Sequence, residues 1–297
     1  MKFVGILGIF VCTFGGLLIA MGFYIPGFMK LMTLMAKATP GEFVIIMGCA
    51  LCAFIIGNTG DVIKSTMGYF SALSKPEAYS KADYVELLSM MFTVFKLART
   101  KGWLALETHI ENPEDSDLFS QFPKFQHNHH AITFLCDYLR IISLGNENAF
   151  EIEALMDQEI ETINSHESHP GHAVQHMADG IPALGIVAAV LGVIKTMSSI
   201  NEPPEILGKM IGSALVGTFL GVWLAYGIVG PIASAMTAKA ETEVMYYKVM
   251  KVGIIAYLNG AAPQVAVEFS RKLLPHSAQP SFAELEETLN ELPSPTS

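Results

Sequence analysis

Charged side chains are scarce in this sequence. They make up 15% of its 297 residues, whereas 51% of the residues are hydrophobic, and an average soluble protein is about 25% charged. The 18 Lys and Arg residues are outnumbered by 28 Asp and Glu and form no basic stripe. Nucleic acid is therefore a poor candidate partner, because contacts to phosphate dominate such binding. Three of the four cysteines lie in long apolar runs, which excludes a secreted disulfide scaffold.

Four long apolar stretches contain almost no charged residue. These stretches are bounded by Lys2 and Lys30, by Glu42 and Asp61, by Asp179 and Glu202 (with only Lys195 inside), and by Lys209 and Lys239. Each can supply the roughly 20 residues that a helix needs to cross about 30 Å of hydrocarbon. We therefore predict four transmembrane helices, over 3–22, 43–60, 181–200 and 210–229. The alternative for the first is a secretory signal peptide, but the stretch is long and no A-x-A cleavage site ends it.

The segment between the second and third predicted spans is polar, since residues 61–178 hold 8 Lys or Arg and 17 Asp or Glu. Lysines follow the second and the fourth span, at Lys64, Lys75, Lys81, Lys239, Lys248 and Lys251. By the positive-inside rule this places the polar segment and both termini in the cytoplasm. We expect an all-α integral membrane protein with spans in 1–60 and 179–230, a large helical cytoplasmic domain over 61–178, and cytoplasmic helices and a tail over 231–297.

Apolar residues recur at intervals of three and four in residues 84–95 and 132–142, which predicts two amphipathic helices. Gly102 and Gly145 are placed to end them. Residues 239–258 are expected to continue the fourth span as a helix.

An acidic helix is predicted over 146–165, with Phe150 and Leu155 on its buried side. Near the end of the chain, Ser281 and Glu284 have the spacing of a capping box, which predicts the start of another helix.

Small residues repeat at four-residue spacing in the last two predicted spans. The repeats are Gly185 with Ala189, Ala188 with Gly192, and Ser213 with Gly217, Gly221 and Ala225. Such ladders let helix backbones approach closely in a membrane. They are explained either by packing of the third span on the fourth or by contact with another subunit.

Polar groups and prolines mark the same two spans. Thr218 and Tyr226 share one face of the fourth span; the Thr218 hydroxyl either bonds the carbonyl one turn back or lines a polar seam together with Tyr226. Pro182 is expected at the first turn of the third span, where its missing N–H costs nothing, and Pro231 is expected to close the fourth. A hinge role is the alternative for both prolines.

No Asp or Glu lies inside any of the four predicted spans, so hydroxyls and backbone carbonyls are the only candidate ion-binding groups there. Proton relays within membranes normally need a titratable side chain. If this chain conducts protons, another polypeptide must supply the carboxylate.

Histidines form two groups, His127, His129 and His130, and His166, His169, His172 and His176. A metal site is one interpretation, but Pro170 is expected to interrupt any helix through the second group and the sequence has no HExxH. We therefore expect a solvated loop and no metal. The sequence also lacks a nucleophile elbow, a P-loop and a dinucleotide-binding turn, so we expect neither an enzyme nor a cofactor.

Several longer blocks carry a more specific resemblance. They are FIIGN (54–58), IENP (110–113), FEIEALMDQEIET (150–162), ADGIPALGIVAAVLGVIKTM (178–197), ALVGTFLGVWLAYGIVGPIA (214–233) and NGAAPQVAVEFSRKLLPHSAQPSFAELEE (259–287). In these blocks the sequence resembles the MotA family of flagellar motor stator subunits, part of the MotA/TolQ/ExbB proton channels, over nearly the whole chain.

The resemblance implies a stator complex in the inner (plasma) membrane, with five such chains surrounding two copies of MotB, whose single membrane helix carries the ion-binding aspartate. It also implies that Pro182 and Pro231 couple ion flow to movement and that Thr218 faces the partner's aspartate. Arg99 and Glu107, which spacing alone would not single out, would engage the rotor protein FliG.

The resemblance also bears on the ion. Sodium-driven relatives of the PomA type tend to have threonine where this chain has Ala189, so the loss of an oxygen ligand favours protons. A sodium-driven stator, a TolQ or ExbB type of energiser, a membrane metalloprotein built on the histidines and a scaffold without an ion path remain as alternatives.

Overall fold

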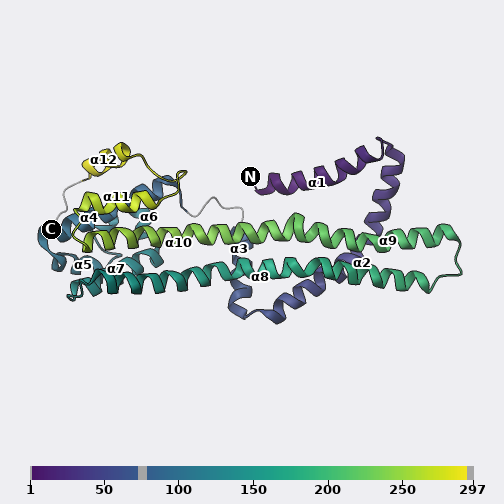
Figure 1. The fold of residues 1–297 in the computed structure, drawn as a ribbon, viewed down its shortest axis with the longest axis horizontal. Coiled ribbons are helices and arrows are strands. Elements are labelled where there is room, and N and C mark those ends of the chain that lie inside the picture. The colour runs from purple at the N-terminus through teal and green to yellow at the C-terminus, as the bar shows by residue number, and fades with distance from the viewer. Residues whose placement is uncertain (1, 73–78, 293–297) are drawn as a thin grey trace. The chain divides into compact units, whose positions relative to one another are not determined.

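A computed structural model describes residues 2–72 and 79–292, and within these ranges every regular element is a helix (Figure 1). The all-α prediction is confirmed for these residues. The elements are α1 (Lys2–Ala20), α2 (Ile25–Gly57), α3 (Gly60–Ala72), α4 (Lys81–Lys101), η1 (Trp103–Leu106), α5 (Glu107–Glu111), η2 (Phe119–Gln121), α6 (Pro123–Gln126), α7 (His129–Ser143), α8 (Ala149–Met197), α9 (Pro204–Leu224), the π-helical turn η3 (Ala225–Val229), α10 (Gly230–Leu258), α11 (Pro263–Leu273) and α12 (Phe282–Glu291).

The chain divides into two compact units. The first contains the described residues of Met1–Pro76 and Ser168–Ala238, and the second contains those of Glu77–Glu167 and Lys239–Ser297. The helices α8 and α10 each contribute residues to both units.

The first unit holds the apolar helices. Among the described residues, the helical runs Ile25–Gly57, Ala149–Met197 and Pro204–Leu258 are long and apolar enough to cross a membrane, and α1 contributes a shorter apolar run, Val4–Ala20. α1 packs on α9, where the Trp223 indole N–H donates to the Thr13 hydroxyl at 3.1 Å and the Phe10 ring meets the Trp223 ring edge to face.

Two prolines lie inside α8, which corrects two expectations. Pro182 is not at the first turn of a helix and Pro170 does not interrupt one, because α8 continues through both for 49 residues. Each proline removes the N–H that would bond the carbonyl four residues earlier. Packing on either side of Pro182 offsets this loss, since Ala178, Ile181 and Ala188 are buried in the core of the first unit.

The second unit has its own hydrophobic core, built from α4, α7, the start of α8 and the end of α10. Both predicted amphipathic helices are confirmed, because residues 84–95 lie within α4 and residues 132–142 lie within α7. Gly102 and Gly145, which follow these helices, have φ values of +81° and +98°, conformations that glycine adopts without steric cost.

The start of α8 buries a different face from the one predicted. Phe150 and Leu155 are 80% and 49% exposed, whereas Ile152, Met156 and Ile160 lie in the core of the second unit. The buried residues recur every four positions, so they form one stripe along the helix. Phe150 and Leu155 lie outside this stripe.

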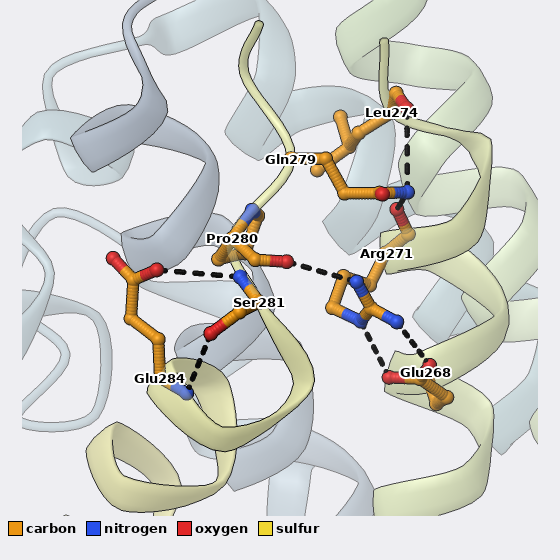
Figure 2. Close-up of polar contacts among 7 residues, drawn as sticks. All are labelled: Glu268, Arg271, Leu274, Gln279, Pro280, Ser281 and Glu284. Atoms are coloured by element: carbon orange, nitrogen blue, oxygen red, sulfur yellow. Dashed lines mark hydrogen bonds and ion pairs between the residues drawn. The ribbon is translucent and has the colours of Figure 1, made fainter. Parts of the chain in front are cut away.

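A polar network fixes the C-terminal helices α11 and α12 (Figure 2). The buried Arg271 guanidinium donates to the Glu268 carboxylate at 2.5 and 2.7 Å and to the Pro280 carbonyl at 2.8 Å. The predicted capping box is confirmed, because the Ser281 hydroxyl accepts from the Glu284 N–H and the Glu284 carboxylate accepts from the Ser281 N–H.

The same carboxylate ties α12 to α4. Lys81 Nζ lies 2.6 Å from Glu284 Oε2. The hydrogen bond from the Lys81 ammonium, together with that from the Ser281 N–H, lowers the pKa of Glu284 from its ordinary value of 4.5.

Candidate functional site

The helices α8 and α9 meet backbone to backbone at their small residues. A Cβ atom added at Gly185 would lie 2.9 Å from the Gly217 carbonyl oxygen and 3.0 Å from the Gly221 Cα. A Cβ atom at Gly217 would lie 3.2 Å from the Ala188 Cβ. Real Cβ atoms essentially never approach a backbone atom as closely as 2.9 Å, so the backbone would have to shift for any other residue at Gly185, and the space at Gly217 is tight. The intramolecular interpretation of the small-residue ladders is therefore confirmed for this part of the two helices, which we call the α8–α9 seam (residues 185–192 and 214–221).

Thr218 belongs to the α9 side of this seam, and its hydroxyl is unbonded within the described part of the chain. Within the described ranges, the threonines Thr13, Thr39, Thr66 and Thr196 of the same unit each donate to the carbonyl four residues back, but Thr218 makes no hydrogen bond to any described group. Its side chain is half-buried. The expected bond to the carbonyl one turn back is thus absent, and the hydroxyl stays available to another polar group.

Tyr226, the second residue predicted to line the polar seam, lies in a π-helical turn. It belongs to η3, in which the Gly230 N–H donates to the Ala225 carbonyl, five residues back. Its side chain is 67% exposed. Single π-helical turns inside α-helices are frequent at functional sites.

Pro231 follows this turn directly and does not end the helix, because α10 continues to Leu258. Pro231 therefore lies inside a continuous helix. Proline has no N–H to donate, so the carbonyl four residues before Pro231, that of Gly227, cannot receive its usual bond. The π-helical turn accommodates the proline within a continuous helix, and the predicted continuation over 239–258 is confirmed.

Ala189 lies on the α8 side of the same region. Its backbone nitrogen would be 3.2 Å from a Cβ atom at Gly217, and its side chain is half-buried. The structure thus brings Ala189 close to the residue that precedes Thr218. Pro182, also half-buried, lies two helical turns before Ala189 on α8, since about 3.6 residues make one turn.

The carboxylate of Glu42, which lies outside the predicted spans, contacts the α8–α9 seam, since a Cβ atom at Gly217 would lie 2.7 Å from its Oε2 atom. Because α2 begins at Ile25 and not near Phe43, Glu42 lies inside a helix that is apolar enough to cross a membrane. Its Oε2 atom is buried and has no hydrogen-bond partner in the described part of the chain. The helix therefore begins well before the predicted second span, 43–60, and Glu42 lies one residue before that span.

Glu42 was not predicted to lie within a helix because its charge marked the beginning of the apolar stretch that ends at Asp61. The apolar character of Leu31, Leu34 and Met35, which precede it on the same helix, was the signal that could have extended the predicted helix.

Arg99 and Glu107 are positioned by the turn that follows α4. Arg99 lies in the last turn of α4, Gly102 ends that helix, and Glu107 begins α5. Both side chains are exposed, and no ion pair involves either of them in the residues that the structure covers. They are therefore free to meet charges on another molecule.

The second histidine group is not in a loop, which corrects that expectation. His166, His169, His172 and His176 lie on α8, each exposed. His127, His129 and His130 line a pocket of the second unit with Tyr79 and Lys124. Within residues 2–72 and 79–292, no group of three His, Cys, Asp or Glu side chains is arranged to hold a metal ion.

Comparisons with known proteins cover nearly the whole chain. Residues 3–102 match the family described as motility protein A N-terminal, and residues 127–249 match the MotA/TolQ/ExbB proton channel family. Motility protein A of Salmonella typhimurium is 42% identical over 86% of this chain and 87% of its own length. Motility protein A of Escherichia coli is 41% identical over 94% and 95%.

The fold has a solved counterpart. The structure of the flagellar MotAB stator complex from Bacillus subtilis contains a chain that superposes with a TM-score of 0.69, at 27% identity, over 92% of this chain and 95% of that one. The similarity in sequence and in fold therefore extends across both units.

Proposed function

The chain belongs to the motility protein A family, and on that premise we propose that it is a stator subunit of the flagellar motor. With a MotB-type partner it forms a proton channel and converts proton flow into torque on the rotor. It is not an enzyme. The observation that carries this function is the α8–α9 seam together with Thr218, whose hydroxyl makes no hydrogen bond to any described group.

The proposed topology has four spans with both termini in the cytoplasm. Three spans correspond to the long apolar runs, and α1 is the fourth. The apolar run Val4–Ala20 would extend for about 25 Å at 1.5 Å per residue, which is close to the thickness of the hydrocarbon core. The lysines that follow the second and the fourth span favour this orientation, with residues 61–178 and 231–297 in the cytoplasm.

The proposed assembly is five copies of this chain around two copies of the MotB-type partner, embedded in the lipid of the inner membrane. Apolar side chains on the outer faces of α8 and α9 are exposed in the single chain, among them Ile186, Val190, Leu215 and Val222. Such side chains need lipid or another subunit to cover them. Membership of a MotAB complex, as in the Bacillus subtilis structure, would supply both.

In the proposed ion path, the partner's aspartate faces Thr218 and Ala189. A charged carboxylate is stabilised by a hydroxyl donor, so the unbonded Thr218 hydroxyl suits the charged form. The neutral acid tolerates the methyl group of Ala189. Each proton that crosses releases about 2.3 kcal/mol per 100 mV of membrane potential, and the change in charge alters which subunit the partner's helix prefers.

Coupling to the rotor is assigned to the prolines and to the exposed charges. Pro182 and Pro231 lie in α8 and at the start of α10, and both helices continue from the first unit into the second. A rearrangement around these prolines would therefore move residues in both units. Arg99 and Glu107 would transmit the movement to a rotor protein of the FliG type by electrostatic contact.

The test is to supply this chain, with its MotB-type partner, to cells that lack stator units. We expect swimming that stops with a protonophore and does not depend on sodium. Sodium-dependent swimming would instead assign the chain to the sodium-driven class. Absence of rotation together with undisturbed membrane insertion would contradict the proposal.

A further inference from the structure

Three lysines of the first unit line one pocket. Lys30 and Lys37 of α2 and Lys209 of α9 meet at a cavity of about 460 Å³, which we call the lysine pocket. Lys30 and Lys37 are seven residues apart, so they lie two helical turns apart on the same face of α2. Helix α9 packs on this part of α2, since a Cβ atom at Gly212 would lie 3.5 Å from Leu34 Cδ2. The pocket therefore gathers positive charge from two helices.

These lysines have no acidic partner at contact distance. All three side chains are exposed, and none forms an ion pair in residues 2–72 and 79–292. The carboxylates nearest to them along the chain, those of Glu42 and Glu205, are not within 4.0 Å of any of the three. Lys and Arg are normally in excess on the cytoplasmic side of a membrane, whereas the proposed topology puts the starts of α2 and α9 on the opposite side. Unpaired positive charges around one pocket attract an anion.

An apolar groove continues from the lysine pocket, and Leu31 lines both cavities. The groove has a volume of about 530 Å³ and extends over Leu17 of α1, Met35 of α2 and Leu215 of α9. Leu215 is 62% exposed, so the unit itself does not cover this wall. An exposed apolar surface of this kind needs lipid or a partner to cover it.

The groove offers no free polar side chain. Among the described residues that line it, Thr13 alone carries a polar side chain. Its hydroxyl donates to the Ile9 carbonyl at 2.8 Å and accepts from the Trp223 indole N–H at 3.1 Å. The hydroxyl is thus satisfied within the unit, and the groove suits a hydrocarbon chain rather than a polar ligand.

We propose that the lysine pocket and the apolar groove together bind one anionic phospholipid. Its phosphate lies between Lys30, Lys37 and Lys209, and an acyl chain lies along Leu31 and the groove. Basic pockets between membrane helices bind anionic lipid head groups. A free phosphate ion would use the lysines and leave the groove empty, so a lipid accounts for both features. The inference rests on the proposed topology, in which the starts of α2 and α9 meet the outer layer of lipid head groups, and it does not depend on the ion path.

The experiment measures lipid binding to the complete chain with its MotB-type partner, purified in detergent, by native mass spectrometry. The complex is titrated with phosphatidylglycerol or with phosphatidylcholine that has the same acyl chains, and we expect tighter binding of phosphatidylglycerol. Each lysine near an anionic head group contributes about fivefold in affinity. The triple variant Lys30→Gln, Lys37→Gln and Lys209→Gln should therefore bind phosphatidylglycerol more weakly, on the order of 100-fold.

Matched variants separate the charge from the groove. Lys101→Gln, Lys248→Gln and Lys272→Gln together make the same change in net charge at exposed positions of the second unit and should leave binding unchanged. Gly16 of α1 lines the groove, and a Cβ atom there meets nothing within 4 Å, so Gly16→Leu fills the groove and should weaken binding. Gly5→Leu makes the same change on α1 outside the groove, also where a Cβ atom meets nothing within 4 Å, and should not.

Equal affinity for the two lipids, or equal binding by the two triple variants, would overturn the inference. Full binding by Gly16→Leu would also overturn it, because the acyl chain would then not lie in the groove. If the first triple variant does not co-purify with the partner, the salt dependence of the unsubstituted complex decides. Salt screens ionic attraction, so it should weaken the binding of phosphatidylglycerol and not that of phosphatidylcholine, and binding of phosphatidylglycerol that is independent of salt would overturn the inference. Failure of the complex to drive swimming would instead contradict the proposed function and leave the lipid site standing.

Discussion

Replacing Gly221 by alanine tests whether the α8–α9 seam needs backbone contact. The added Cβ atom would lie 2.8 Å from the Gly185 Cα and 3.2 Å from the Ile181 carbonyl oxygen. Backbone atoms cannot rotate away as the end of a flexible side chain can, so the two helices would have to separate. Overpacking of this kind costs about 1–3 kcal/mol, whereas alanine gains at most about 1 kcal/mol over glycine in a helix. Subtracting the full gain from the cost leaves a net loss of about 1 kcal/mol, within a range of about 0–2 kcal/mol.

The matched control lies on the same helix. A Cβ atom at Gly208 of α9 would meet nothing within 4 Å, so Gly208→Ala should keep or slightly raise stability. The assay is the temperature at which the purified complex loses its size-exclusion peak, together with swimming. Gly221→Ala should lower that temperature by about 2 °C or more and reduce swimming. Equal behaviour of the two variants would refute the close packing of α8 on α9.

Three further predictions concern the ion path, the rotor contact and the tail. Thr218→Val, which removes the unbonded hydroxyl at nearly constant volume, should reduce ion flow and swimming while membrane insertion stays normal; unchanged swimming speed would remove its role. Reversing both charges, Arg99→Glu with Glu107→Arg, should lower torque without altering proton leak, and normal torque at low ionic strength would contradict the electrostatic contact. Because Lys81 lowers the pKa of Glu284 below its ordinary value of 4.5, the pair stabilises the second unit above pH 4.5 and loses this effect as the pH falls further. Thermal unfolding of Glu284→Gln should therefore show less acid sensitivity, and identical pH profiles would contradict this assignment.

The helices were largely predictable because charge and periodicity report on burial directly. A stretch without charges can be buried in lipid along its whole length. The absence of charged residues therefore predicted the positions of α1, α9 and the apolar part of α8. The turns that follow α4 and α7 were also predictable, since Gly102 and Gly145 adopt the positive φ that few other residues tolerate.

The prolines show where local rules fail. Pro170 and Pro182 were expected to interrupt or to begin a helix, but α8 runs through both. A proline in a helix costs about 3 kcal/mol, which packing of the flanking residues can offset. That packing involves residues distant in sequence, so it cannot be inferred from the proline and its neighbours. The π-helical turn before Pro231 was missed for the same reason.

The candidate site was predictable in its residues but not in its geometry. The four-residue spacing singled out the small residues of α8 and α9, and the resemblance to the MotA family singled out Thr218. Neither could reveal that Thr218 makes no hydrogen bond or that Glu42 inserts against Gly217, because both facts depend on which helix faces meet. The choice of Phe150 and Leu155 for the buried face of α8 failed because more than one apolar stripe can be drawn on that helix.

The central claim is that this chain conducts protons only together with a partner that supplies an aspartate. The most direct measurement is proton current through liposomes that contain either the purified chain alone or the chain with its MotB-type partner, at equal protein content and membrane potential. We expect a current with the partner and none without it. An equal current through the chain alone would contradict it.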